Sequence, residues 1–404
     1  MVLPSLTDSG LDDLLNNIAR DLYEHKINEG FIHPELYKLN ADKLMTALTE
    51  GLGGSSFDYS DNRNQLGAFL QQNIHAFSAA KSLYEMRHFA NMMVREDDTL
   101  RSFTEFRNKV LSHGKQFNVN YLQAEYNTAV ASAQMASQWD MLSASQYLEY
   151  TTAGDGRVRP EHAALDRFTA PSDDKVWNTI YPPNAWNCRC HVVPGTQANV
   201  GRVKVEKPDD WSKEPYKIDP YFQRNCGQMK AIFDIEHPNE GAYFIMNVTK
   251  PNQLLAAKHY NMKPVEDLLT NKSANNFSSV EQANNWWKDI STNGILDLKD
   301  PKGLTIRIDD ETIRHTIEDH PKENRWKFIN EIVNVITDAD EIWSTRIKGN
   351  IERIYIKYYD QTPLIVRVND SMRPYSIHNM LEDKKINKGQ AISLRKGALI
   401  HEKK

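Results

Sequence analysis

The sequence predicts a multidomain α+β protein with a helical N-terminal region, a loop-rich middle domain and a small C-terminal domain built on a four-stranded antiparallel sheet. Apolar residues recur at helical spacing as far as about residue 145, prolines and polar residues crowd the stretch 155–195, and apolar and polar residues alternate in short runs after residue 340. At 404 residues the chain has room for two or three domains. We expect four ranges: the helical region 1–70, the loop-rich domain 71–240, a connector 241–292 and the C-terminal domain 293–404.

Composition argues against several classes of protein. A net charge of −5 with 25% charged residues argues against a generic nucleic-acid binder. Three cysteines in the whole chain argue against a disulfide framework. The first residues lack the basic and apolar regions of a signal peptide, and no window approaches the roughly 18 apolar residues of a membrane span. We therefore expect a soluble protein that has no membrane span and is not secreted by a signal peptide.

Helices are predicted through most of the first 145 residues. Within 1–55, and again within 70–145, apolar residues recur three to four positions apart. The pair His113-Gly114 predicts a helix end, after which a longer helix begins. Small residues on one face of that longer helix imply close approach to a second helix. Its face is formed by Leu122, Tyr126, Ala129, Ala133 and Ala136, and a strand follows at 147–152.

The C-terminal domain has a different pattern. A strand at 304–308 and a helix at 310–320 precede a second helix, whose apolar residues run from Ile329 to Ile336. The next runs alternate with period two, which is typical of an antiparallel sheet with one solvated face. Helices followed by a meander of strands indicate an α+β domain. The four predicted strands are 341–345, 353–359, 364–368 and 375–380.

The stretch 155–195 holds two cysteines, Cys188 and Cys190, and two histidines, His162 and His191. Zinc usually takes four ligands, and a Cys-x-Cys pair brings both sulfurs to one point only if the backbone turns, which Asn187 permits. One interpretation is a zinc site formed by His162, Cys188 and Cys190, with His191 as the fourth ligand. A second is a pair of buried thiols beside a histidine that caps a turn. A third is a hydrolase using Cys188 and His162, although no glycine-flanked nucleophile turn accompanies them.

The stretch holds Asp155, Arg157, Arg159, His162 and Leu165, then Pro182-Pro183, then Asn187-Cys188-Arg189-Cys190. By these residues, the region from about residue 77 to about residue 238 resembles the Mu F-like head-morphogenesis family. The resemblance implies a minor head protein of a phage or prophage, located in the virion or the host cytoplasm, with portal and capsid proteins as partners and a role in head assembly or DNA delivery. Other relatives carry a Cys-x-x-Cys pair at the positions of Arg159 and His162, which implies structural zinc and leaves the fourth ligand here open.

The C-terminal domain carries residues suited to RNA cleavage. Such cleavage without a metal needs a base, an acid and cations for the phosphate. From residue 370 onward the chain has eight basic residues and four acidic ones. A basic sheet face that bears aromatic rings would suit RNA. Structural roles are equally open, because His320 before Pro321 suits a helix end and arginines at alternate strand positions suit a solvated face. The candidates are His315, His320, Arg346, Tyr355, Arg367, Ser376 and His378.

The C-terminal domain has the order strand, helix, helix and four-stranded meander, with His315 to Pro321, 337–343, Tyr355-Ile356-Lys357, and Ser376 and His378 along it. By this order and these residues it resembles the phage-borne branch of the barnase–EndoU–colicin–RelE nuclease superfamily. The resemblance implies a metal-independent ribonuclease that needs no cofactor for catalysis, with His315 or His320 as general base. Arg346 or Arg367 would then hold the phosphate, and Ser376 or His378 would complete the acid side. The alternative is a catalytically inactive module that binds capsid, portal or DNA. A live nuclease would call for an immunity partner, which the sequence does not identify.

Overall fold

A computed structural model describes residues 8–54, 62–205, 207–235, 255–318, 324–379, 381–382 and 385–403. The chain forms two compact units, one from Met1–Phe57 and Phe77–Asn252 and the other from Asp58–Ala76 and Gln253–Lys404. The first is mainly helical and the second carries an antiparallel sheet, so the predicted α+β class is confirmed. The four predicted domain ranges stay a prediction. Among the described residues no helix is long and apolar enough to cross a membrane.

The first unit is built on helices whose apolar faces meet in one core. Leu14, Leu15 and Ile18 of the first helix pack with Phe89 and Phe106 of two later helices, which confirms the predicted helical spacing. The helices are α1 (Asp8–Tyr23), α2 (Pro34–Gly51), the second part of α3 (Asn62–Asn91), α4 (Phe103–Lys115), the π-helix η2 (Gln116–Tyr121) and α5 (Leu122–Ser143).

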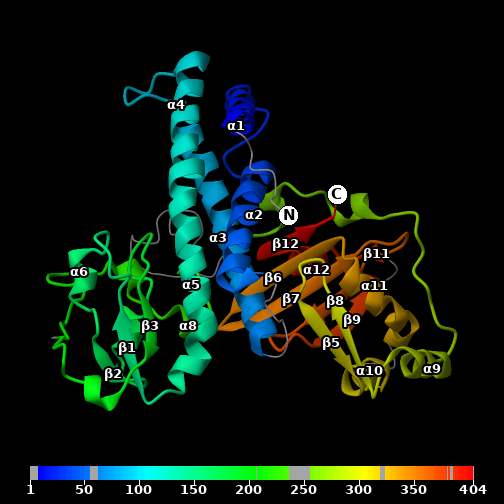
Figure 1. Ribbon diagram of the computed structural model, residues 1–404. Helices are drawn as coiled ribbons and strands as arrows, with labels where there is room; N and C mark the ends of the chain where they lie inside the picture. The colour runs from blue at the N-terminus through cyan, green and yellow to red at the C-terminus, as the bar shows by residue number, and fades with distance from the viewer. Residues whose placement is uncertain are drawn as a thin grey trace. The chain divides into compact units, whose positions relative to one another are not determined.

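The predicted helix end at His113-Gly114 is wrong, because α4, η2 and α5 run on as one rod (Figure 1). Gly114 is buried against the first helix, and a Cβ there would lie 2.4 Å from the Leu15 side chain. The glycine therefore serves close helix packing. The expected small-residue contact is confirmed, because a Cβ on Gly51 of α2 would lie 2.7 Å from the Ala133 Cβ of α5.

A small sheet follows these helices in the same unit. Its strand order is β2-β1-β3, with the predicted strand β1 (Tyr147–Thr151) in the middle and antiparallel to both neighbours. Long loops and short helices connect the strands. The remaining elements are β2 (Thr169–Pro171), β3 (His191–Pro194), α6 (Pro160–Ala163), α7 (Trp177–Ile180), η3 (Gln197–Asn199), η4 (Pro220–Phe222) and α8 (Cys226–Met229).

The second unit contains a five-stranded antiparallel sheet, not the predicted four strands, in the order β12-β6-β7-β8-β9. The four predicted strands correspond to β6 (Glu341–Ile347), β7 (Asn350–Lys357), β8 (Leu364–Val368) and β9 (Pro374–Asn379). The added strand, β12 (Ala398–Glu402), pairs with β6 across more than fifty residues of chain, a contact that local periodicity does not reveal.

The other elements of the second unit surround this sheet. The strands β4 and β5 form a hairpin, of which the sequence predicted only the second strand. The predicted helices at 310–320 and around 329–336 are both present. These elements are η6 (Ala257–Tyr260), η7 (Val265–Leu268), α9 (Val280–Ile290), β4 (Ile295–Lys299), β5 (Thr305–Asp309), α10 (Asp310–Glu318), η9 (Arg325–Glu331), α11 (Ile332–Thr337), β10 (Leu381–Glu382), β11 (Lys385–Ile386) and α12 (Lys388–Leu394).

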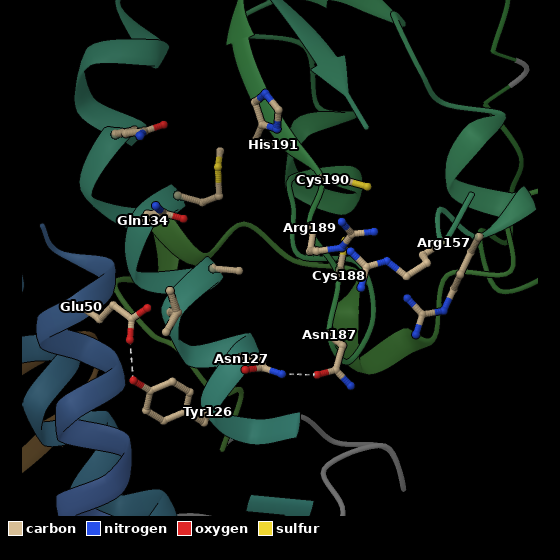
Figure 2. Close-up of a pocket in the computed structure, with 15 residues that line it drawn as sticks. Glu50, Tyr126, Asn127, Gln134, Arg157, Asn187, Cys188, Arg189, Cys190 and His191 are labelled. Atoms are coloured by element: carbon tan, nitrogen blue, oxygen red, sulfur yellow. Dashed lines mark hydrogen bonds between the residues drawn. The ribbon is translucent and has the colours of Figure 1, made fainter. Parts of the chain in front are cut away.

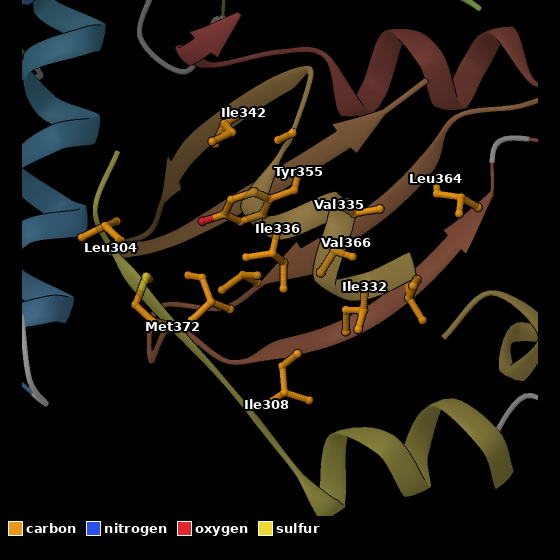
Figure 3. Close-up of a cluster of buried hydrophobic side chains, with 14 of the residues drawn as sticks. Leu304, Ile308, Ile332, Val335, Ile336, Ile342, Tyr355, Leu364, Val366 and Met372 are labelled. Carbon is orange, nitrogen blue, oxygen red and sulfur yellow. The ribbon is translucent and has the colours of Figure 1, made fainter. Parts of the chain in front are cut away.

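The expectation of one solvated sheet face is wrong at the centre of the sheet. On one face, Val335 and Ile336 of α11 pack against Tyr355 and Val366 (Figure 3). On the other face, residues from the connector cover the strands, because the Tyr260 ring lies 5.3 Å from that of Trp343. Consecutive residues of β7 are therefore buried on both sides.

Candidate functional site

Three of the predicted catalytic residues meet at one cavity in the second unit. Arg367, Ser376 and His378 line a space of about 510 Å³. Sequence reasoning missed the rest of the lining. Arg325 and Phe328 come from η9 and Gln390 from α12, which are distant in sequence and carry no motif, whereas Ile377 and Asn379 flank His378 on β9. The added lining residues are Arg325, Phe328, Ile377, Asn379 and Gln390.

The geometry of the cavity follows from the strand period. Ser376 and His378 lie two residues apart on β9 and therefore face the same side. The Ser376 Oγ lies 3.1 Å from the His378 Nδ1, and the Arg325 Nη1 lies 3.5 Å from the same Oγ. Arg367 is the register partner of Ser376 on β8. Two guanidinium groups, a hydroxyl and an imidazole thus share one pocket.

Arg367 already has an acidic partner at the edge of this pocket. Its Nε and Nη2 donate to Glu352 Oε1 at 2.8 and 2.6 Å, and its guanidinium lies 5.3 Å from the Tyr375 ring. The Tyr375 hydroxyl donates to the same carboxylate. Burial, together with this hydrogen bond, raises the pKa of Tyr375. Arg367 is therefore held in a fixed position beside β9.

The other predicted catalytic residues that the structure describes do not line this cavity. His315 lies on α10, which packs against β9 and is tied to it by the Thr312 Oγ1, 3.3 Å from the Pro374 carbonyl oxygen. His320 lies outside the described residues. The Arg346 guanidinium lies 5.3 Å from the Phe69 ring, on the far side of β7 from the cavity strands.

Tyr355 is fully buried in a polar network within the core. Its hydroxyl lies 2.9 Å from Asp300 Oδ2 and accepts from the Arg353 Nε at 3.1 Å. Burial raises the pKa of Tyr355 well above its usual value. The expected basic, aromatic sheet face is therefore wrong for this strand. Tyr358 and Tyr359 are buried as well, and Arg353 and Arg395 are buried in ion pairs.

In the first unit the three predicted metal ligands converge. The His162 Nδ1 lies 3.6 Å from both the Cys188 and the Cys190 sulfur, and all three residues are buried. Hydrogen bonding from Cys190 and then from His162 lowers the pKa of Cys188 to about 4, and the hydrogen bond to Cys188 together with burial raises that of Cys190. The triad can hold a cation or share protons.

Local structure explains this convergence. Proline at the first position of α6 starts the short helix that carries His162. Asn187 adopts a left-handed φ of 59°, which turns the chain just before the cysteines. Arg189 then forms two hydrogen bonds of 2.7 Å to Asp155. The loop on either side of the triad is thereby tied together.

A larger hollow of about 970 Å³ lies beside these residues in the same unit. Figure 2 shows Arg157, Arg189 and Asn187 on one wall, with Asn187 hydrogen-bonded to Asn127 of α5 at 2.8 Å. His191 also lines this hollow, and its ring lies away from the Cys190 sulfur. Of the four predicted zinc ligands, the structure therefore brings together three, which are His162, Cys188 and Cys190.

Two family models match separate parts of the chain. Residues 101–193 match "Phage Mu protein F like protein", and residues 290–402 match "phage-Barnase-EndoU-ColicinE5/D-RelE like nuclease2". These matches confirm both predicted resemblances.

Two relatives are similar over part of the first region. A stretch of 76 residues is 41% identical to the "Putative capsid assembly protein F" of Escherichia phage Mu, covering 19% of this chain and 16% of that protein. A stretch of 65 residues is 40% identical to the Mu-like prophage FluMu F protein of Haemophilus influenzae, covering 16% of each. No solved structure matches the chain. The chain therefore carries a region of the phage Mu protein F type, followed by a region similar to phage nucleases of the barnase–EndoU–colicin–RelE type.

Proposed function

We propose that this protein is a minor head protein of a Mu-like phage or prophage, located in the virion near the portal, that carries a ribonuclease at its C-terminal end. The presence of both kinds of region in one chain supports this proposal. A relative of the first region is named for capsid assembly. A head protein delivered with the DNA would bring its nuclease into the host cytoplasm.

The cavity lined by Ser376 and His378 is the observation that carries the nuclease proposal. It places an imidazole, a hydroxyl and the guanidinium groups of Arg325 and Arg367 around one space. Guanidinium groups match the geometry of phosphate oxygens, and an imidazole can exchange a proton near neutral pH. A phosphodiester bound there would have its charge balanced and a proton carrier beside it.

The proposed reaction is transesterification of RNA. A base removes the proton from the 2′-hydroxyl, the 2′-oxygen attacks phosphorus, and the bond to the 5′-oxygen breaks as an acid protonates it. The products are a 2′,3′-cyclic phosphate and a 5′-hydroxyl. His378, which lines the cavity, supplies one proton transfer. We assign the other to His315, which does not line the cavity but lies on α10, the helix packed against β9, or to His320. Arg325 and Arg367 stabilise the charge that develops on the phosphate.

The test uses the purified full chain, RNA and an excess of chelator. We expect cleavage that leaves cyclic phosphate ends, and His378→Ala is expected to reduce the rate by about 100-fold or more, in line with loss of a general acid or base. Arg325→Ala and His315→Ala are measured in parallel. Arg346→Gln is the matched control, because Arg346 lies away from the cavity and should leave the rate unchanged.

Two outcomes would contradict the nuclease proposal. The first is cleavage that survives replacement of each of His315, His320 and His378. The second is RNA binding without cleavage by the unaltered protein, which would favour the inactive binding module. Expression in a host without an immunity partner gives an independent readout, since the active protein should arrest growth and His378→Ala should relieve the arrest.

The head-protein proposal has its own test. Mass spectrometry of purified particles should detect the chain together with portal and capsid proteins, at a few copies per particle. Its absence from mature particles and from assembly intermediates would contradict the proposal, whatever the nuclease assay shows.

A further inference from the structure

We propose that His162, Cys188 and Cys190 bind one Zn²⁺ ion, with a water molecule as the fourth ligand. The site lies in the first unit and is independent of the proposed nuclease. It joins the short helix α6 to the turn before β3 across 26 residues of chain. Its proposed role is to hold the loop-rich part of this unit together.

The distances fit a tetrahedral zinc centre. Zinc lies about 2.3 Å from a thiolate sulfur and about 2.0–2.1 Å from a histidine nitrogen, so a tetrahedral angle places that nitrogen about 3.6 Å from each sulfur. The His162 Nδ1 lies 3.6 Å from the Cys188 sulfur and 3.6 Å from the Cys190 sulfur. A single ring N–H can be directed at only one sulfur. The equal distances are therefore better explained by a shared ion than by one hydrogen bond.

The space among these residues fits one ion. A small cavity of about 20 Å³ is lined by His162, Cys188 and Cys190. That exceeds the roughly 10–15 Å³ needed for a single water-sized particle. Two thiolates would also balance the double charge of the ion, and sulfur and imidazole ligands are those that zinc prefers over magnesium or calcium.

Surrounding groups would orient the ligands. The Tyr150 hydroxyl donates to Asn184 Oδ1 at 2.9 Å, and the backbone N–H of Asn184 points to the Cys188 sulfur. Hydrogen bonds of this kind to metal-bound sulfur are common around metal sites. Burial of Tyr150 and Asn184 keeps these partners in place.

Protein side chains supply three ligands and no more among the described residues. No fourth histidine, cysteine or carboxylate from the described ranges joins the cluster. His191 begins β3 directly after Cys190, and its ring points away from the Cys190 sulfur, as Figure 2 shows. The other charged residues that line the small cavity are Arg157, Arg159 and Arg189, which cannot bind a cation. The fourth position is therefore left to water.

Metal analysis of the full chain, purified without chelator, tests the proposal. We expect one zinc per chain, and a fall to near zero in Cys188→Ser, Cys190→Ser and His162→Ala. Cys226→Ser is the matched control, because Cys226 is also buried but lies elsewhere, 3.4 Å from the Ser132 carbonyl oxygen. His191→Ala should keep its zinc as well.

Cobalt gives a second measurement that does not depend on the folding of a variant. After zinc is removed from the unaltered protein, added Co²⁺ should produce thiolate charge-transfer absorption and the intense visible bands of tetrahedral cobalt. The Cys226→Ser protein should give the same spectrum. Zinc below one per ten chains together with no cobalt spectrum would overturn the proposal. Equal zinc loss in Cys226→Ser would overturn the ligand assignment.

Discussion

Each of the two units buries a cluster of charged side chains, and the two clusters are satisfied to different degrees. In the first unit Lys81 of α3 pairs with Glu125 of α5 at 2.6 Å, with Glu85 nearby. In the second unit Arg353 pairs with Asp300 at 2.8 Å, beside Tyr355. All four paired side chains are at most 1% exposed. The difference lies in what else each carboxylate receives.

Asp300 in the second unit is fully occupied. Its Oδ1 accepts the backbone N–H groups of Lys302 and Leu304 at 2.8 and 3.0 Å, and its Oδ2 accepts from Arg353 and Tyr355. The Arg353 Nη1 also donates to Gln71 Oε1 at 3.2 Å. A buried ion pair is stable when its remaining hydrogen-bonding groups are satisfied in this way.

The cluster in the first unit has one cation for two carboxylates. The Lys81 Nζ donates to Glu125 and to the Phe117 carbonyl oxygen in the π-helix η2. The Oε1 atoms of Glu85 and Glu125 have no hydrogen-bond partner among the described residues. Burial raises the pKa of Glu85 to about 7, against a usual value of 4.5. Glu85 in the first cluster therefore titrates near neutral pH.

The largest expected effect comes from breaking the satisfied network. Asp300→Asn leaves the Arg353 charge buried without its partner, which should cost about 3–5 kcal/mol of local stability. Hydrogen exchange of peptides covering residues 350–368 measures that loss, because these strands carry the network.

Asp297→Asn is the matched control for that experiment. Asp297 pairs with Arg307 in the same β4–β5 hairpin, but both side chains are 41% exposed. Exposed pairs contribute about 0–1 kcal/mol, so protection of 350–368 should barely change. Equal losses in the two variants would show that burial does not distinguish the pairs.

A smaller effect of opposite sign is expected in the first cluster. Below pH 4.5 Glu85 is protonated in both the folded and the unfolded chain. Between pH 4.5 and about 7 the unfolded chain loses the proton first, so stability falls as pH rises, and above pH 7 the full penalty remains. At about 1.4 kcal/mol per unit of pKa, the penalty is on the order of 3 kcal/mol. Glu85→Gln should therefore stabilise the unit at pH 8 and change little at pH 4.5.

Hydrogen exchange in peptides of α3 and α5, corrected for the intrinsic effect of pH, measures this difference. Glu105→Gln is a control of opposite sign, because hydrogen bonds from Ser102 lower the pKa of this exposed carboxyl. Its stabilising contribution is present at pH 8 and is lost as the pH falls. A gain in stability that is the same at pH 4.5 and pH 8 would exclude Glu85 ionisation as the cause.

Local periodicity was enough to predict most elements of both units. It failed where a residue serves a distant partner. Gly114 looked like a helix end but makes room for Leu15 of α1. The strand β12 gains its place only by pairing with β6. The buried positions of Lys81 and Glu85 could not be predicted, because charged residues in a helix are expected on a solvated face, whereas this part of α3 is buried on nearly all sides.

The candidate sites show the same contrast between residues that lie close in sequence and residues that only the fold brings together. Ser376 and His378 could be predicted to act together because they lie two residues apart on one strand, and the cysteine motif identified its triad by spacing. Arg325 and Gln390 reach the cavity from separate elements, so only the folded chain brings them there. Tyr355 was predicted as a site residue but is buried in the core, because the strand pattern alone does not distinguish a tyrosine in the core from one in a site.

The smallest expected effect therefore concerns Tyr355, where stability and cleavage can be separated. Tyr355→Phe removes the hydroxyl that lies 2.9 Å from Asp300, and hydrogen bonds to charged groups contribute about 1.5–3 kcal/mol. Protection of 350–368 should fall by about 2 kcal/mol, less than in Asp300→Asn. RNA cleavage, measured well below the unfolding temperature, should match that of the unaltered protein, whereas His378→Ala should lose cleavage and keep its protection. Loss of cleavage in Tyr355→Phe with unchanged protection would contradict this prediction. It would show that Tyr355 acts in catalysis and that the stability of the network depends on the Asp300–Arg353 pair alone.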